Sequence, residues 1–160
     1  MSEWIIEERA WDDPAGVALR AAQEAELDAR YGGENHEPGE HPSADDVDVF
    51  LVAARDGTPV GCGALRRLDA SSAEIKRMYV VPAARGSGVA TAVLRALEHR
   101  AVARGWPVLR LETGTEQPDA RRFYEREGYR QIPRFGVYAG SELSVCYERT
   151  LGPDRGVGVM

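Results

Sequence analysis

Apolar positions along the chain alternate between two spacings, one typical of β-strands and one typical of α-helices. Short apolar runs rich in β-branched residues favour strands, and the longer segments between them carry apolar residues at helical intervals. The predicted strands cover residues 4–11, 47–54, 59–68, 73–81, 107–113, 129–132 and 143–150. The predicted helices cover residues 14–31, 88–104 and 118–127.

The order of these segments predicts an α/β fold on a mixed sheet. A strand and a helix come first, an antiparallel meander follows, and strand–helix units and two closing strands complete the chain. Within the meander, the Asp56-Gly57 pair is typical of a two-residue hairpin turn. No segment has the length of a linker, so we expect residues 1–151 to form a single domain. Residues 152–160 include three glycines and one proline, and we expect a flexible tail there.

The composition excludes several classes of protein. The formal net charge of −6 argues against non-specific nucleic-acid binding, because such binding needs a basic surface. No apolar run approaches the length of a membrane span and the acidic N-terminus lacks a signal-peptide pattern, so we expect a cytoplasmic protein without membrane contact. Cys62 and Cys146 lie in apolar runs with no CxxC partner, which predicts buried free thiols. His36 and His41 have no converging ligand set, so no metal site is expected.

The segment from Arg85 to Thr91 joins a predicted strand to a predicted helix through two glycines. A helix that begins after such a turn presents unpaired backbone N–H groups and the positive end of its dipole, which together bind phosphate. Gly86 and Gly88 carry no Cβ, so the backbone can approach a ligand closely. A mononucleotide P-loop is excluded because the Gly-Lys-Ser/Thr ending is missing. A Rossmann NAD-binding module stays open as an alternative, with Glu112 as its acidic ribose ligand, although Thr91 replaces the third glycine.

The spacing of Arg85, Gly88 and Ala90 resembles the acyl-CoA-binding signature of the GNAT N-acetyltransferase superfamily. The resemblance extends over residues 47–151 and includes the segments 109–114 and 120–129. It implies the GNAT acyl-CoA N-acyltransferase fold, a central mixed and mostly antiparallel sheet flanked by about four helices. It also implies acetyl-CoA as the co-substrate, and homodimers are common in the family.

The same resemblance assigns the cofactor-binding residues. It places the pantetheine arm of CoA along the strand before the turn, as an added strand would bind, and the pyrophosphate on the turn itself. The first group is Met78, Tyr79 and Val80, and the second is Arg85, Gly86, Ser87, Gly88, Val89, Ala90 and Thr91. A backbone N–H of that strand could also stabilise the oxyanion that develops during acyl transfer. Gln117 stands where family members often carry an asparagine that contacts the CoA arm, and this contact departs from the family pattern.

Three residues are candidates for the catalytic chemistry. Tyr124 matches the family tyrosine that gives a proton to the departing CoA thiolate, and the alternative is an ordinary core tyrosine. An amine must lose a proton to attack, and Glu112 or Glu74 would accept it directly or through water. Both carboxylates lie on predicted strands, where a solvated strand face is the competing interpretation.

The segment between the first helix and the second strand is acidic. It contains Glu34, Glu37, Glu40, Asp45 and Asp46, which would attract a cationic amine. We therefore expect an N-acetyltransferase that moves an acetyl group from acetyl-CoA to a primary amine of a small molecule by direct attack in a ternary complex. A protein N-terminal or lysine acetyltransferase of the same fold and a non-catalytic CoA-binding domain are the alternatives.

Overall fold

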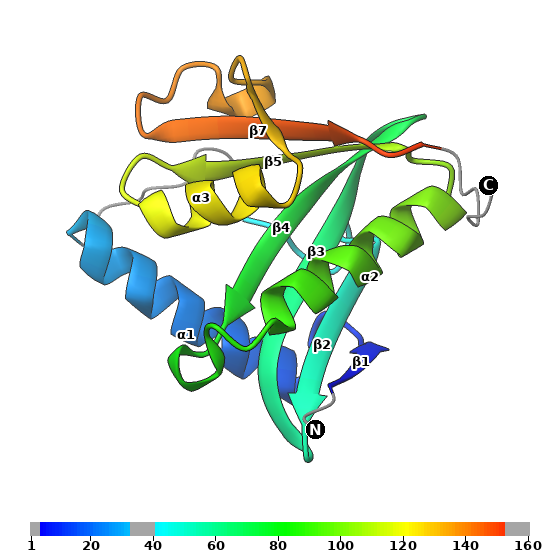
Figure 1. The fold of residues 1–160 in the computed structure, drawn as a ribbon, viewed down its shortest axis with the longest axis vertical. Helices are drawn as coiled ribbons and strands as arrows, with labels where there is room; N and C mark the ends of the chain where they lie inside the picture. Colours follow the sequence, from blue (N-terminus) through cyan, green and yellow to red (C-terminus); the bar gives the residue numbers. More distant parts are fainter. Residues whose placement is uncertain (1–3, 33–40, 153–160) are drawn as a thin grey trace.

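One seven-stranded sheet organises the structure, a computed structural model that describes residues 4–32 and 41–152 (Figure 1). Its strand order is β1-β2-β3-β4-β5-β7-β6. The strands are β1 (Ile5–Glu8), β2 (Val49–Arg55), β3 (Thr58–Asp69), β4 (Ser72–Val80), β5 (Val108–Gly114), β6 (Arg130–Ile132) and β7 (Ser144–Thr150). The helices are α1 (Pro14–Tyr31), α2 (Val89–Ala103) and α3 (Pro118–Arg126), with short 3-10 turns η1 (Pro82–Ala84) and η2 (Gly136–Tyr138). The expected α/β fold is confirmed, and the described residues form three α-helices where about four were expected.

Local capping and turn residues explain where these elements begin and end. The Asp13 carboxylate accepts a hydrogen bond from the Ala15 N–H at 3.1 Å, which caps α1 at its first turn. Gly32, with a φ of 75°, adopts the left-handed conformation that ends the same helix. Asp56 and Gly57 both have positive φ, 52° and 82°, as the predicted two-residue hairpin between β2 and β3 requires.

The parallel pair β4 and β5 separates along its length, and this separation positions the functional site. The two strands pair from Ser72 to Ile75 against Val108 to Leu111, and no further pairing between them is recorded beyond Ile75. They diverge visibly beyond that point (Figure 1), while β5 stays paired with β7 from Val108 to Gly114. All other pairs in the described sheet are antiparallel, which excludes the doubly wound parallel sheet of the Rossmann alternative.

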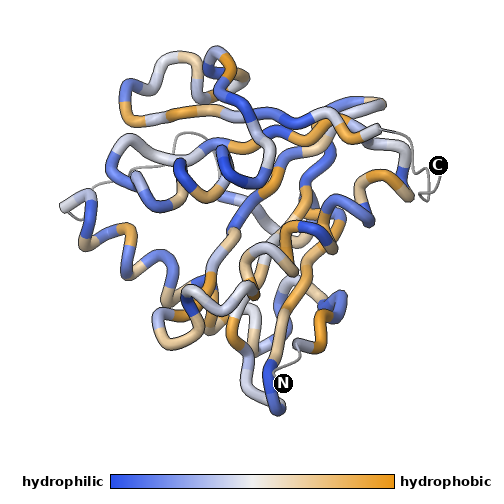
Figure 2. The backbone as a smooth tube through the Cα atoms, viewed as in Figure 1, coloured by the Kyte–Doolittle hydropathy of each residue, from blue (hydrophilic) through white to orange (hydrophobic). Residues whose placement is uncertain are grey.

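Two hydrophobic clusters lie on opposite faces of the sheet. Leu51 of β2 belongs to the cluster that contains Leu97 of α2, and its neighbour Phe50 belongs to the cluster that contains Leu19 of α1. Successive side chains of one strand therefore point to opposite faces of the sheet, as the twofold repeat of a strand requires. The tube in Figure 2 is hydrophobic over much of the central strands, which helices cover from both sides.

Some expectations fall on parts of the chain outside the described residues. These include Glu34, His36, Glu37 and Glu40 of the acidic segment and most of the predicted tail, residues 153–160. Of the helices that the structure describes, none has both the length and the apolar character needed to cross a membrane.

Candidate active site

Two connected hollows open where β4 and β5 diverge. A groove of about 680 Å³ runs along β4, the turn before α2, α1 and α3. A smaller pocket of about 100 Å³ lies between the two strands and the end of α1. The residues that line both hollows mark their junction: Gln23, Leu27, Met78, Gln117, Ala120 and Tyr124.

The glycine turn forms one end of the groove. Gly86 and Gly88 have φ values of 79° and 97°, and α2 begins at the next residue, Val89. Gly88 has no side chain with which to cap the helix, and the first residues of α2 line the groove, where unpaired helix N–H groups can bind an anion. Ser87 differs from the rest of the turn, because its hydroxyl donates to the Ala84 carbonyl at 2.5 Å and it does not line the groove.

The exposed edge of β4 forms the floor of the groove, and side chains from neighbouring elements reach it. Gln23 Nε2 donates to the Met78 carbonyl at 2.9 Å, and Arg85 Nε donates to the Val80 carbonyl at 3.0 Å. Arg85 also pairs with Glu26 of α1, Nη2 to Oε1, at 2.7 Å. The predicted residues Met78, Tyr79, Val80 and Arg85 therefore line one continuous surface with the turn.

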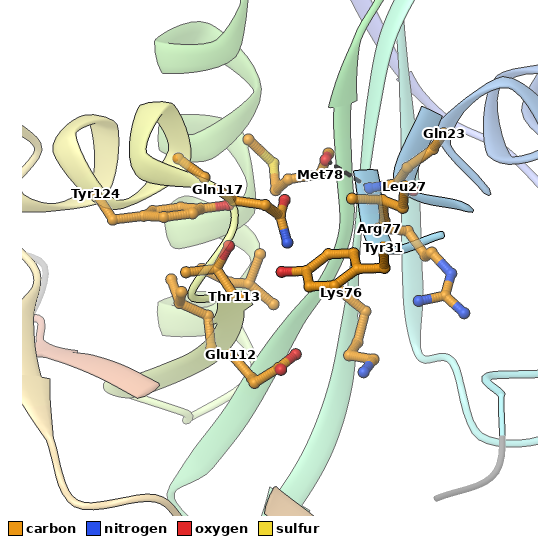
Figure 3. A pocket seen from close by; sticks show the side chains of 14 residues that line it. Gln23, Leu27, Tyr31, Lys76, Arg77, Met78, Glu112, Thr113, Gln117 and Tyr124 are labelled. Carbon is orange, nitrogen blue, oxygen red and sulfur yellow. Dashed lines mark hydrogen bonds between the residues drawn. The ribbon is translucent and has the colours of Figure 1, made fainter. Parts of the chain in front are cut away.

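Tyr124 stands at the junction of the groove and the pocket. It is only 7% exposed, and the rings of Phe123 and Tyr129 pack edge-on against it at 5.1 and 5.8 Å. Burial raises the pKa of the Tyr124 phenol above its ordinary value, so the hydroxyl keeps its proton at neutral pH. Figure 3 shows the ring extending from α3 toward Gln117 and the interior of the pocket. A buried, protonated phenol in this place can act as a general acid.

Glu112 lies on the wall of the pocket, on the diverging part of β5. Its Oε2 accepts a hydrogen bond from the Ser144 hydroxyl of β7 at 2.7 Å, which fixes the orientation of the carboxylate. In Figure 3 the Glu112 side chain extends from β5 toward the side of the pocket where Lys76 lies, and Thr113 lies between it and Tyr124. A carboxylate held on the pocket wall can accept a proton from a bound amine.

Glu74, the second candidate base, lies elsewhere. It is 1% exposed and is not among the residues that line either hollow. Arg66 Nη2 and Glu74 Oε1 are 3.0 Å apart, and the Tyr138 hydroxyl donates to Oε2 at 2.5 Å. Lys76, which does line the pocket, is 3.5 Å from the same Oε2 and donates to Tyr138 at 2.8 Å. The Glu74 carboxylate thus belongs to a buried polar cluster that fastens η2 to β4.

Several residues that line the pocket were not singled out from the sequence. Gln23, Leu27 and Tyr31 come from α1, and Thr113 comes from β5. The first three are four residues apart, so they share one face of the helix. That spacing was visible in the sequence, but nothing in it indicated that this face would meet the gap between β4 and β5. Gln117, which was predicted, lies at the start of α3 and lines both hollows.

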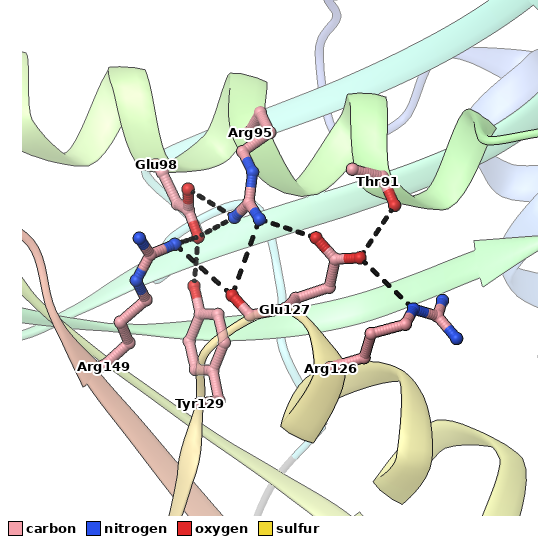
Figure 4. Close-up of polar contacts among 7 residues, drawn as sticks. All are labelled: Thr91, Arg95, Glu98, Arg126, Glu127, Tyr129 and Arg149. Atoms are coloured by element: carbon pink, nitrogen blue, oxygen red, sulfur yellow. Dashed lines mark hydrogen bonds and ion pairs between the residues drawn. The ribbon is translucent and has the colours of Figure 1, made fainter.

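A polar network holds α2 against the end of α3 (Figure 4). Glu127 accepts from Thr91 Oγ1 at 3.1 Å and pairs with Arg95 at 2.6 Å. Glu98 of α2 pairs with Arg95 at 2.9 Å and accepts from the Tyr129 hydroxyl at 2.8 Å. The helix that begins at the glycine turn is thereby tied to the segment that carries Tyr124.

Both cysteines are buried free thiols, as predicted. Burial raises the pKa of Cys62 to about 12, and its thiol donates to the Arg77 carbonyl at 3.3 Å. Neither lines the groove or the pocket between β4 and β5. Within residues 4–32 and 41–152, no group of three or more His, Cys, Asp or Glu side chains is placed to hold a metal ion.

Known proteins resemble this chain in sequence and in structure. Residues 11–129 match the model of the Acetyltransferase (GNAT) family. The IAA acetyltransferase of Azospirillum brasilense is 40% identical over 103 residues, which cover 64% of this chain and 67% of the relative. A protein from Klebsiella pneumoniae assigned as an acyl-CoA N-acyltransferase superposes with a TM-score of 0.80 and 32% identity, over 93% of this chain and 98% of that one. A GNAT family acetyltransferase from Elizabethkingia anophelis with acetyl-CoA bound shares the fold, with a TM-score of 0.70 and 16% identity over 92% and 98% of the two chains.

The family match includes the parts of the chain that build both hollows, from α1 through β4 and the glycine turn to Tyr124. The resemblance inferred from the turn is confirmed, and so is the central, mostly antiparallel sheet. The chain belongs to the GNAT family of acetyltransferases.

Proposed function

We propose that the protein transfers an acetyl group from acetyl-CoA to a primary amine of a small molecule, by direct attack within a ternary complex. The observation that carries this proposal is the position of Tyr124, at the junction of the long groove with the small pocket that contains Glu112. A donor in the groove and an acceptor in the pocket would meet beside its hydroxyl.

The lining of the groove supports acetyl-CoA as the donor by its chemistry. The N–H groups at the start of α2 and the positive-φ glycines offer a cradle for the pyrophosphate, with Gly86, Gly88, Val89, Ala90 and Thr91 as its lining. The edge of β4 at Met78, Tyr79 and Val80 offers backbone groups to an amide-containing arm. When bound, acetyl-CoA supplies the acetyl thioester.

Glu112, in the pocket, and Tyr124, at the junction, divide the proton transfers between them. Glu112 takes a proton from the ammonium form of the acceptor, and the neutral nitrogen then attacks the acetyl carbon. The C–N bond forms, the C–S bond breaks, the nitrogen gives its second proton to water, and Tyr124 gives its proton to the sulfur. Solvent then restores both residues, so that the products are an N-acetyl amide and CoA with a free thiol. No covalent enzyme intermediate is required.

Glu112 is the better candidate for the base, for two reasons. It lies on the pocket wall, whereas Glu74 already has Arg66, Lys76 and Tyr138 around its carboxylate. Glu112→Gln should therefore lower the rate by about 10²-fold or more at neutral pH. Higher pH should restore much of that rate, since more of the amine is then already deprotonated. Glu74→Gln should act mainly on stability and should show no such recovery.

The dimensions of the pocket support a small acceptor. This pocket measures about 100 Å³, less than an engineered protein cavity of about 150 Å³ that binds benzene. The relative named IAA acetyltransferase also supports a small-molecule acceptor over a protein one.

Isothermal titration of the purified protein with acetyl-CoA tests the proposal first, with NADH as the control ligand. We expect micromolar binding of acetyl-CoA and no response to NADH. A panel of aliphatic amines, amino acids and lysine peptides, followed by detection of the released thiol, then tests the transfer itself. Binding of acetyl-CoA without acetylation of any amine would favour the non-catalytic CoA-binding domain. Transfer to peptides alone would favour a protein acetyltransferase.

A further inference from the structure

Gly114, the last residue of β5, is a glycine for a reason other than its backbone conformation. It is absent from the glycines with positive φ, so a larger residue could adopt the same backbone. A Cβ at this position would instead overlap the Tyr31 hydroxyl and stand 2.8 Å from Tyr31 Cζ and 3.0 Å from Gln117 Nε2. The Tyr31 hydroxyl therefore occupies the space that a side chain at position 114 would need.

Tyr31 reaches Gly114 from the opposite side of the pocket. It is the last residue of α1, and its hydroxyl accepts a hydrogen bond from the Glu116 N–H at 3.2 Å, just beyond β5. Figure 3 shows the ring extending from α1 across the pocket, with its hydroxyl toward Thr113. The phenol thus spans the gap between α1 and the diverging end of β5 and forms one wall of the pocket.

We propose that Tyr31, seated on Gly114, sets the upper size of the acceptor, and that the acceptor presents an unbranched aliphatic amine to the site. The proposal rests on the acetyl transfer proposed above. With Tyr31 in place the pocket measures about 100 Å³, which is smaller than an engineered protein cavity of about 150 Å³ that binds benzene. Removing the phenol frees space on the order of one such ring, which would admit an aromatic amine.

The test compares two primary amines that differ in bulk, ethylamine and benzylamine, by their kcat/KM with acetyl-CoA saturating. The wild-type enzyme should favour ethylamine. Tyr31→Ala should raise the benzylamine-to-ethylamine ratio by about tenfold or more, since one methylene misfit in a pocket changes kcat/KM by about 10- to 200-fold. Tyr31→Phe is the matched control, because it keeps the ring and removes only the hydroxyl. Its ratio should stay near that of the wild type.

Gly114→Ala perturbs the same contact from the other side. The added methyl should clash with the Tyr31 hydroxyl and lower the melting temperature. Adding Tyr31→Ala should recover most of that melting temperature, because the clashing partner is then gone. This thermal cycle requires no activity. It therefore reports on the contact even where the variants differ in turnover.

The possible results separate the two proposals. Failure of the wild-type enzyme to acetylate any amine of the panel would count against the proposed function. An unchanged amine ratio in Tyr31→Ala, from an enzyme that acetylates ethylamine, would overturn the size limit alone. Equal loss of melting temperature from Gly114→Ala with and without Tyr31 would also overturn it.

Discussion

The replacement Tyr124→Phe tests the chemistry of the site most directly, because it removes one oxygen atom and leaves the packing in place. Tyr124 is nearly buried, and its ring packs edge-on against Phe123 and Tyr129. Phenylalanine can keep both aromatic contacts. We therefore expect a stability change below about 1.5 kcal/mol, the usual range for a swap that conserves shape.

The expected loss of rate follows from the role of the hydroxyl. General acid catalysis contributes roughly 10²- to 10⁴-fold, and we expect the lower end here. The groove of about 680 Å³ leads away from Tyr124, so that water can reach the sulfur and replace part of the lost donor. A fall in kcat of about 10²-fold corresponds to about 2.7 kcal/mol of activation free energy.

Tyr129→Phe is the matched control on a neighbouring buried tyrosine. Its hydroxyl donates to Glu98 Oε2 at 2.8 Å and does not line either hollow. Loss of a hydrogen bond to a charged group costs about 1.5–3 kcal/mol, and Glu98 keeps its two arginine partners, so we expect the lower value. Tyr129→Phe should thus lower the melting temperature by about 3–6 °C with kcat nearly unchanged. Tyr124→Phe should show the opposite pattern.

Release of the CoA thiol, followed with a thiol reagent, measures both variants. Background from the protein should be low, since Cys62 and Cys146 are buried and burial raises the pKa of both thiols. Single-turnover measurements ensure that the chemical step is observed. An unchanged single-turnover rate in Tyr124→Phe would remove this residue from the mechanism, and a large loss of rate in Tyr129→Phe would show that packing, not proton donation, explains both results.

Three further predictions concern binding and stability. Gly86→Ala places a Cβ on a backbone with φ of 79°, which costs about 1–2 kcal/mol, so the Kd for acetyl-CoA should rise measurably in isothermal titration; an unchanged Kd would exclude the turn from binding. Glu98→Gln removes the buried charge that pairs with two partly exposed arginines, and the free energy of unfolding should fall by about 2 kcal/mol. Calorimetry should then show a melting temperature lower by about 4–8 °C. Burial raises the pKa of Cys62 from 9.0 to about 12 on folding. The stabilisation that the buried neutral thiol gives the folded state is therefore complete below pH 9, and the free energy of unfolding falls by about 1.4 kcal/mol per pH unit between pH 9 and about 12. Cys62→Ala should flatten that alkaline decline in denaturant titrations, and an equal slope in both proteins would contradict the assignment.

Much of the fold could be predicted from the sequence because its signals are local. Asp13, Gly32 and the Asp56-Gly57 pair act within a few residues of their own positions, and the elements that they bound begin and end close to the predicted limits. The turn at Gly86 and Gly88 is local in the same sense. Its positive φ values follow from residue type, and the phosphate binding proposed for it follows from the helix that it starts.

Local sequence could not show which of the two candidate bases lines the pocket. Glu74 and Glu112 both occupy strands, and the sequence around each is similarly mixed. The structure separates them through distant partners. Arg66 lies directly across the β3–β4 pair from Glu74, and Tyr138 reaches it from 64 residues further along the chain. Neither contact has a sequence signature, because strand register and loop packing decide both.

Tyr31 illustrates the same limit for the acceptor site. Tyr31 is the last residue of a helix, and its sequence context indicates no function. Gly114 is the last residue of a strand, where a glycine is ordinary. Their relation becomes visible only when α1 is placed across the gap between β4 and β5. In the proposals above, acceptor specificity would therefore depend on contacts between elements, whereas CoA binding would depend on a contiguous motif.

Contacts between elements also hold the proposed CoA-binding turn and the proposed acid, Tyr124, relative to each other. The proposed phosphate cradle lies at the start of α2 and the proposed acid, Tyr124, lies on α3, and hydrogen bonds between strands do not join these helices. Thr91, in the first turn of α2, donates to Glu127 just after α3, and the Tyr129 N–H donates to the Tyr124 carbonyl at 2.9 Å. Tyr129 in turn donates to Glu98 of α2, which closes a ring of contacts around the two helices (Figure 4). The distance from the proposed cradle to Tyr124 is thus fixed by a network that includes Thr91 of the groove and side chains outside it, and a donor bound at its phosphates would meet Tyr124 at a set depth.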